Sequence, residues 1–369
     1  MKPLVPFSLE RWFYMYEFVV DINLCASCAE TTNTNQLLAM GKDKREAYLN
    51  LPLDYIESNG TAAFRQAVSN QYTSISMEEI LAATGASEAI SMLMLADVSP
   101  GDEIVVQWPI YQSLFALAES LGANIVKWLP DQSFRWHTSD LENIVTDKTK
   151  MIIINTPHSP TGFCFSTMQM TEIAHTVDEK KIRLISDEVY RGVFYNDDYP
   201  PAAADLMPSG VSIGDLTKPY GLGGLRVGWI ASSDKELLTN CAQVRDYTTM
   251  CCAAPSEFLA AIALENKERL LRDKIKHAKQ NIMQFGQFIE NNPDKLEWNI
   301  PQGGYTAFPK IKVNMSSYEF CSNFVKEADV LLLPGTVFGY DQHFRIGFGL
   351  PPQVFSRGLE RFEAFLKNI

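Results

Sequence analysis

A regular alternation of apolar runs with helical segments constrains the fold of this chain more than any other feature. Segments such as Gln112–Gly122, Ser139–Val145 and Thr167–Lys180 are expected helices between the runs. Apolar strands that alternate with helices are typical of a mostly parallel sheet that helices cover on both faces. The sequence therefore predicts an α/β fold. The expected strands are Glu79–Ala83, Glu103–Gln107, Asn124–Trp128, Met151–Asn155, Arg183–Asp187, Ser212–Asp215 and Val227–Ala231.

The length of 369 residues and the changes of pattern along the chain predict two domains and an N-terminal arm. Residues 1–40 form the arm, which we expect to pack on the smaller domain and the active site. Residues 41–255 form a large ligand-binding domain, and residues 256–369 a small α+β domain. A long helical stretch is expected from Lys235 to about Asn291, with a kink at Ala254-Pro255.

Composition and charge exclude several classes of partner. A net charge of −12 argues against nucleic acid, whose phosphates would be repelled. The sequence has no apolar run of membrane-spanning length and no signal-peptide core, so a cytoplasmic protein without a membrane partner is expected. The seven cysteines, including the lone pair Cys25 and Cys28, are expected to be free thiols, and no metal site is predicted.

Polar side chains follow several of the expected strands. Asn155, Ser159, Asp187, Tyr190 and Lys218 fall at the carboxyl ends, where ligands bind in open α/β sheets. The turn Gly85-Ala86-Ser87 also joins a strand to a helix N-terminus, which favours an anion.

The glycine-rich stretch Gly214–Trp229 places Lys218 eight residues before Arg226. Lysine forms Schiff bases with aldehydes, and arginine offers a fork of donors to a phosphate. The two residues therefore suit pyridoxal phosphate. A glycine-rich surface loop with two solvated cations fits this stretch equally well when it is taken alone.

Four further residues match what pyridoxal phosphate and an amino acid require. Asp187 could pair with the pyridine nitrogen, Tyr190 could bond the phenolic oxygen, and Tyr111 could stack on the ring. Arg345 could bind an α-carboxylate in a bidentate manner. Each residue alone is more often structural, but together they meet one chemical need.

This ordered set resembles the fold-type I pyridoxal-phosphate enzymes of the class I/II aminotransferase superfamily over residues 50–350. The resemblance implies a large domain with a mostly parallel, helix-covered sheet and a smaller α+β domain. It also implies a homodimer with shared active sites. The motifs are Tyr55 with Gly60, Gly85-Ala86-Ser87, Pro109-Ile110-Tyr111, Asn155–Gly162, Ser186–Tyr190, Lys218 with Arg226, and Arg345.

The resemblance assigns roles to these residues. Lys218 would form the Schiff base and move protons, and Asp187, Tyr190 and Tyr111 would hold the ring. Arg345 would bind the substrate α-carboxylate. The phosphate would be held by Gly85, Ala86, Ser87 and Arg226, with Tyr55 contributed by the neighbouring subunit.

Three positions depart from the family pattern. Ser159 stands where the family usually has an asparagine that donates to the phenolic oxygen, and His158 precedes it as a candidate substrate contact. Asp215 stands where a phosphate-donating serine is usual. A carboxylate cannot donate and would repel a phosphate, so Asp215 is either turned away or serves other chemistry. Thr217 is the candidate replacement donor.

With aspartate at position 215, the chain resembles the O₂-dependent pyridoxal-phosphate arginine oxidases of antibiotic pathways. This subgroup includes arginine hydroxylases and the indolmycin-pathway arginine 4,5-desaturase. The segment with Leu9, Glu10 and Trp12 resembles the same subgroup and capreomycidine synthase. Cys28 aligns with a histidine of the hydroxylating members, which favours oxidation or desaturation without hydroxylation.

Two functions follow. The first is an oxidase of L-arginine that passes electrons to O₂ through quinonoid intermediates, by 4,5-desaturation or oxidative deamination. Lys218, Asp187 and Asp215 would be catalytic, and Glu10, with Glu17 as a further candidate, would hold the guanidinium. The second is an ordinary aminotransferase. A regulator that has kept the fold fits poorly with an intact cofactor set, and Asp215 favours the oxidase.

Overall fold

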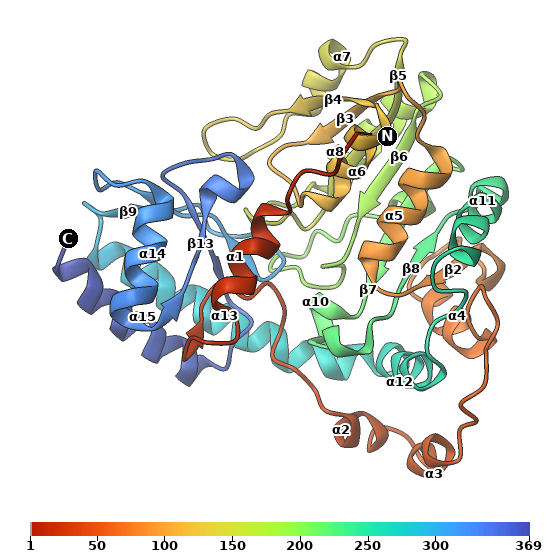
Figure 1. The fold of residues 1–369 in the computed structure, drawn as a ribbon, viewed down its shortest axis with the longest axis horizontal. Helices are drawn as coiled ribbons and strands as arrows, with labels where there is room; N and C mark the ends of the chain where they lie inside the picture. Colours follow the sequence, from red (N-terminus) through yellow and green to blue (C-terminus); the bar gives the residue numbers. More distant parts are fainter. Residues whose placement is uncertain (1) are drawn as a thin grey trace.

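A seven-stranded sheet forms the centre of the large part of the molecule in the computed structural model, which describes residues 2–369 (Figure 1). Strand β8 runs antiparallel to both of its neighbours, and all other pairs are parallel. The predicted α/β fold is confirmed. In spatial order the strands are β2 (Ile80–Ala83), β8 (Gly228–Ala231), β7 (Gly210–Asp215), β6 (Arg183–Asp187), β5 (Thr149–Asn155), β3 (Glu103–Gln107) and β4 (Asn124–Trp128).

Both faces of the inner strands of this sheet are buried, which explains why these strands are mostly apolar. Successive side chains of a strand point to opposite faces. In β5, Met151 and Ile153 belong to one hydrophobic core, whereas Ile152 and Ile154 belong to a second one. The second core is closed by Met170 and other residues of α8.

Helices surround the sheet and build most of the remaining structure. None of them, within residues 2–369, is long and apolar enough to cross a bilayer. They are α1 (Ser8–Tyr16), α2 (Thr34–Leu38), α3 (Lys44–Leu49), α4 (Ala62–Ser69), α5 (Ala86–Asp97), α6 (Ser113–Leu121), α7 (Leu141–Ile144), α8 (Thr167–Glu179), α9 (Ala203–Leu206), α10 (Thr217–Tyr220), α11 (Lys235–Asp246), α12 (Ala254–Glu265), α13 (Lys267–Asn291), α14 (Ser317–Ala328) and α15 (Pro352–Lys367).

The long helical stretch expected from Lys235 to about Asn291 is divided into three helices, and the kink expected at Ala254-Pro255 is wrong. The chain forms α11, α12 and α13, with residues 247–253 outside any helix. Pro255 lies in the first turn of α12. A proline there loses no intrahelical hydrogen bond, so it begins a helix instead of kinking one.

The C-terminal part is a smaller α+β unit in which α14 and α15 pack together beside short strands (Figure 1). This confirms the smaller α+β domain of the predicted fold class. The short strands are β9 (Leu296–Glu297), β10 (Thr306–Ala307), β11 (Lys310–Ile311), β12 (Val330–Leu331), β13 (Leu333–Pro334) and β14 (Phe344–Gly347).

The N-terminal segment contacts both parts of the molecule. Its strand β1 (Ile22–Asn23) pairs in parallel with β12. In α1, the buried Trp12 donates its indole N–H to the carbonyl of Leu332 at 2.9 Å. On the other side, the backbone N–H of Ser8 donates to the Gln112 side chain, next to α6. These contacts hold α1 over the space between the large sheet and the C-terminal part.

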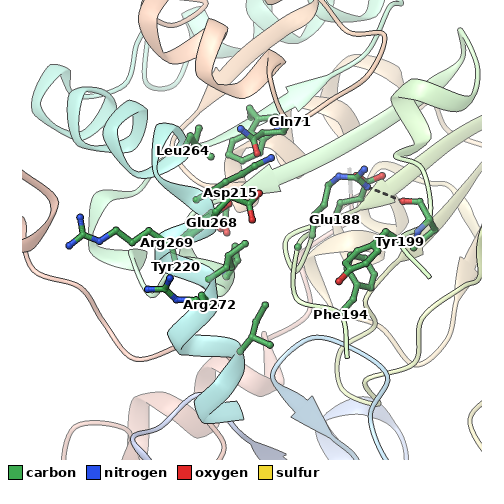
Figure 2. A pocket seen from close by; sticks show the side chains of 18 residues that line it. Gln71, Glu188, Phe194, Tyr199, Asp215, Tyr220, Leu264, Glu268, Arg269 and Arg272 are labelled. Carbon is green, nitrogen blue, oxygen red and sulfur yellow. Dashed lines mark hydrogen bonds and ion pairs between the residues drawn. The ribbon is translucent and has the colours of Figure 1, made fainter. Parts of the chain in front are cut away.

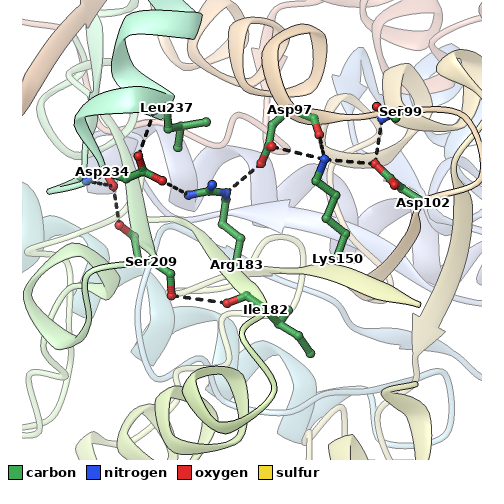
Figure 3. A network of polar contacts seen from close by, with 11 residues as sticks. Asp97, Ser99, Asp102, Lys150, Ile182, Arg183, Ser209, Asp234 and Leu237 are labelled. Carbon is green, nitrogen blue, oxygen red and sulfur yellow. Dashed lines mark hydrogen bonds and ion pairs between the residues drawn. The ribbon is translucent and has the colours of Figure 1, made fainter. Parts of the chain in front are cut away.

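An ionic network ties the amino ends of the strands together, at the edge opposite the predicted ligand groups (Figure 3). Arg183, at the start of β6, donates to Asp97 at 2.7 Å and to Asp234 at 2.9 Å. Lys150 of β5 lies 3.3 Å from Asp97 and 3.2 Å from Asp102. The network connects the ends of α5 and α11 to the sheet.

Replacing Arg183 by alanine should lower the free energy of unfolding by about 2 kcal/mol, because Asp97 and Asp234 lose a shared, mostly buried partner. Urea unfolding at neutral pH measures this change. Lys367→Ala is the control, since its exposed pair with Glu363 should contribute only about 0.5 kcal/mol or less. Equal effects of the two variants would contradict the prediction.

Candidate active site

The carboxyl ends of β5, β6 and β7 open into a cavity of about 260 Å³. It gathers side chains from both ends of the chain, from Leu9 to Arg345. Of the predicted site residues it is lined by Glu10, Ala86, Ser87, Tyr111, Ser159, Asp187, Tyr190, Asp215, Thr217, Lys218, Arg226 and Arg345.

Gly85 and Arg226 build one end of this cavity. Gly85 has φ +80°, and a Cβ atom there would come within 2.5 Å of a terminal guanidinium nitrogen of Arg226. Gly85 precedes α5, whose first N–H groups have no partner within the helix. The Arg226 guanidinium and the free N–H groups of α5 lie on either side of Gly85, which has no side chain. This arrangement suits the binding of a phosphate group.

Lys218 lies at the centre of the cavity against a residue that the sequence did not single out. Its Nζ donates to Oγ of Ser27 at 3.0 Å, and the Tyr190 hydroxyl donates to the Ser27 carbonyl at 2.8 Å. Ser27 lies between Cys25 and Cys28, which are free thiols as predicted. No spacing pattern in the sequence marks Ser27, because only the folding of the arm brings it to Lys218.

Asp187 ends β6 with its side chain in the cavity and almost fully buried. Burial raises the pKa of this carboxyl to about 7; the N–H of Val189 opposes the shift, and Asp215 adds to it. A buried carboxyl of this kind gains most from a cationic partner. The pyridinium nitrogen of pyridoxal phosphate would be such a partner, so the site fits the cofactor here too.

Asp215 is not turned away from the site. It lines the same cavity as Asp187 and Lys218, and its Oδ1 accepts the backbone N–H of Thr217 at 2.9 Å. Burial raises the pKa of Asp215, while the charges of Lys218 and Arg226 act in the opposite direction. Of the two alternatives left by the sequence, the structure contradicts the first, because the carboxyl lines the cavity; a part in the chemistry stays a prediction.

Helix α1 closes the cavity with acidic and aromatic side chains. Glu10 accepts the Tyr111 hydroxyl at 3.1 Å, and Glu17 lies two helical turns further on. Burial raises the pKa of Glu17, and so does the charge of Glu10. The Arg345 guanidinium lies 5.7 Å from the ring centre of Phe13 and donates to the Cys25 carbonyl at 3.0 Å.

His158 does not reach the cavity, so the structure does not support its predicted contact with substrate. Its Nε2 lies 2.7 Å from the Pro109 carbonyl and its Nδ1 2.8 Å from the Thr161 hydroxyl. A carbonyl only accepts, so Nε2 carries the hydrogen and Nδ1 accepts. Burial lowers the pKa of His158 to about 3. This neutral side chain connects the turn before Tyr111 to the turn after Ser159.

We expect His158→Leu to weaken cofactor binding about tenfold, because the unpaired Pro109 carbonyl and Thr161 hydroxyl would loosen the turn that carries Tyr111. Titration of the apoprotein with cofactor measures this. The exposed His175, replaced in the same way, should leave the affinity unchanged. A tenfold loss for both variants would contradict a specific role for His158.

Tyr55 and Asn155 complete the placement of the sequence motifs. Tyr55 is 79% exposed and does not line the cavity of its own chain. Asn155 lines the cavity, but its amide already bonds the Asp187 carbonyl at 2.9 Å and the Ser159 N–H at 2.6 Å. Asn155 therefore fixes the ends of β5 and β6 relative to each other.

A family model described as aminotransferase class I and II matches residues 22–362. The chain belongs to this family. Like its relatives, this aminotransferase-family enzyme uses pyridoxal 5′-phosphate, which supplies an electron sink for reactions at the α-carbon of an amino acid.

Three relatives illustrate the range of the family. Capreomycidine synthase from Streptomyces vinaceus is 31% identical over 284 residues, which are 76% of this chain and 72% of that enzyme. A pyridoxal-phosphate-dependent aminotransferase from Streptococcus suis has a TM-score of 0.94 at 28% identity, covering 99% of this chain and 98% of the other. The pyridoxal-phosphate-dependent cyclase OrfR has a TM-score of 0.93 at 26% identity, covering 100% and 98%.

Proposed function

We propose that this enzyme is an O₂-dependent oxidase of L-arginine that works in the cytoplasm as part of natural-product biosynthesis. The observation that carries the proposal is the position of Asp215, buried beside Lys218 and Asp187 in the cofactor cavity. An aminotransferase would use this position to donate to the phosphate, which a carboxylate cannot do.

Asp215 suits an oxidation because it is a second group that can hold a proton next to Lys218. Oxidation of an amino acid removes two hydrogens from the substrate, and O₂ accepts them as hydrogen peroxide. Lys218 would take the α-proton and later the β-proton; a 4,5-double bond forms when one hydrogen is lost from C4 and one from C5, and O₂ takes this pair as hydrogen peroxide. The raised pKa of Asp215 supports its exchange of a proton with the lysine.

The charges around the cavity favour an amino acid with a cationic side chain. Arg345 is the candidate partner of the α-carboxylate. Glu10 lines the cavity and Glu17 lies two turns further along α1; the charge of Glu10 raises the pKa of Glu17, and nearby cationic groups such as Lys218 and Arg345 lower it. A guanidinium would add a further cation beside these carboxyl groups, so L-arginine is the proposed substrate.

The decisive experiment is O₂ uptake by the cofactor-loaded enzyme with L-arginine and no keto acid. Sustained uptake with formation of peroxide is expected, and Asp215→Ser should lower it at least tenfold. Glu10→Gln should raise the KM for arginine about tenfold, with less effect on kcat, because it removes a charge that binds the guanidinium. Absence of O₂ uptake would contradict the oxidase.

An ordinary aminotransferase is the alternative, and family membership together with the complete set of Lys218, Asp187 and Arg345 favours it. In that case turnover would require 2-oxoglutarate or pyruvate as acceptor and would consume no O₂. The same assay with and without acceptor separates the two functions.

We also propose that the enzyme is a homodimer in which Tyr55 of each chain contributes to the phosphate site of the other. Leu53 and Tyr55 are 85% and 79% exposed, and the neighbouring loop exposes Tyr247 and Met250. The Ser58 hydroxyl donates to the Met250 carbonyl, so the two segments form one surface. Light scattering should give twice the chain mass, and Tyr55→Phe should weaken cofactor binding; a monomer would contradict the proposal.

A further inference from the structure

A second and larger cavity, of about 900 Å³, adjoins the cofactor site at Asp215, and Figure 2 shows its lining. Residues from the first part of α13, including Glu268, Arg269 and Arg272, form one side, and Phe194 and Tyr199 form the other. Asp215 lies at the back of it. Asp215 is the one residue that lines both this cavity and the smaller cofactor cavity among the described residues 2–369.

The wall between the cavities is a single layer of chain. Asp187 lines the cofactor cavity, whereas the next residue, Glu188, lines the larger one. In the same way, Lys218 lines the cofactor cavity and Pro219 lines the larger one. Two short segments, one at the end of β6 and one in α10, therefore separate the two spaces.

The two cavities differ in what can fill them. The smaller one must hold both the cofactor and the amino acid under Leu9, Glu10 and Phe13 of α1, which displaces its water. The larger one ends at exposed residues such as Tyr199, which is 61% exposed, and remains open to solvent when the smaller one is full. Asp215 then has contact with solvent only on the side of the larger cavity.

We propose that the larger cavity is the proton route of the active site and that Asp215 passes protons between its water and Lys218. In each passage the O–H bond of the Asp215 carboxyl breaks as an N–H bond forms on the Lys218 amine, and the carboxylate regains a proton from water in the larger cavity. The reverse sequence releases a proton that Lys218 has taken from the substrate.

The groups around Asp215 support this role. Burial raises the pKa of Asp215, whereas the charges of Lys218 and Arg226 and the bonds from Thr217 lower it; the charge of Asp215 in turn raises the pKa of Asp187. Glu188 is held by Arg191 at 3.4 Å and by the Ser212 hydroxyl at 2.9 Å. Glu188 is thus already paired, whereas Asp215 lines the cofactor cavity together with Lys218 as well as the larger cavity.

The first test measures access to position 215 directly. In Asp215→Cys protein, a small charged thiol reagent should modify residue 215 at a similar rate in the apoprotein and in the protein loaded with cofactor and substrate. Peptide mass spectrometry separates this site from the native thiols. If bound cofactor and substrate prevented modification of residue 215, the reagent would be reaching it only through the smaller cavity. This result would overturn the proposal.

The second test leaves Asp215 intact and narrows the larger cavity with a bulky side chain on α13. Arg272→Trp should lower the incorporation of solvent deuterium at the substrate α-carbon at least fivefold, with unchanged cofactor affinity. Lys276→Trp, one turn further along α13 and outside the cavity lining, should have no effect. Ile275→Trp is a second blocking variant. Unchanged exchange in both blocked variants would refute the route.

The proposal rests on the proposed function only in that Lys218 removes an α-proton within a filled cofactor cavity. That step is common to the oxidase and the aminotransferase. Failure of O₂ uptake would therefore reject the oxidase without affecting the route, whereas failure of the blocking variants would reject the route alone.

Discussion

Replacing Lys218 by alanine should lower turnover at least about 10⁴-fold, the largest effect expected of any single substitution in this enzyme. Among the described residues that line the cavity, Lys218 alone carries an amine that can form a Schiff base, and we expect the same amine to remove the α-proton. Its hydrogen bond to Ser27 at 3.0 Å shows that it already points into the cavity.

Two measurements check this prediction. Turnover is followed with L-arginine in the presence and absence of a keto acid, and the covalent link is tested by borohydride reduction and mass spectrometry. The variant should retain no cofactor mass after reduction, although it can still hold the cofactor through Arg226 and the N-terminus of α5. Lys276→Ala, on the exposed face of α13, serves as control. Turnover above about 1% of the parent would contradict the assignment.

Replacing Asp187 by asparagine should have opposite effects on function and on stability. Turnover should fall about 10³-fold, because asparagine cannot carry the charge that keeps the pyridine nitrogen protonated. The cofactor-free protein, however, should become more stable at pH 8 by about 2 kcal/mol, because the buried charge is removed.

The pH dependence follows from the sign of the shift. The folded-state pKa of Asp187, raised by burial to about 7, lies above the value near 4 of an unfolded aspartate. Its contribution to stability is fully present below about pH 4 and is lost as the pH rises through about 7. The apoprotein should therefore lose stability across this range, and Asp187→Asn should lose less.

Urea unfolding of the apoprotein at pH 5 and pH 8 tests this. The difference in unfolding free energy between the two pH values should shrink in Asp187→Asn and remain in Asp294→Asn, which replaces an exposed aspartate. Equal pH dependence in the parent and in Asp187→Asn would mean that Asp187 does not titrate between these values.

The sequence by itself determined the architecture and most of the site. Apolar runs predicted β3 and β6 with their observed bounds, because a strand buried on both faces cannot alternate apolar with polar residues. Asp187 and Lys218 were recognisable because parallel strands carry their functional groups at one edge. The local sequence pattern was sufficient to predict the position of a residue wherever that position depends only on the residue's own strand or turn.

The tertiary structure alone decided contacts between distant segments. Ser27 reaches Lys218 because β1 pairs with β12, and no local pattern encodes that pairing. His158 looked like a possible substrate contact but lies inside the turn, where Pro109 and Thr161 take both ring nitrogens. The side to which Asp215 points, and the cavity behind it, depend on how α13 and the segment around Tyr199 pack over the sheet. Long-range packing determines these features, and sequence spacing carries no information about it.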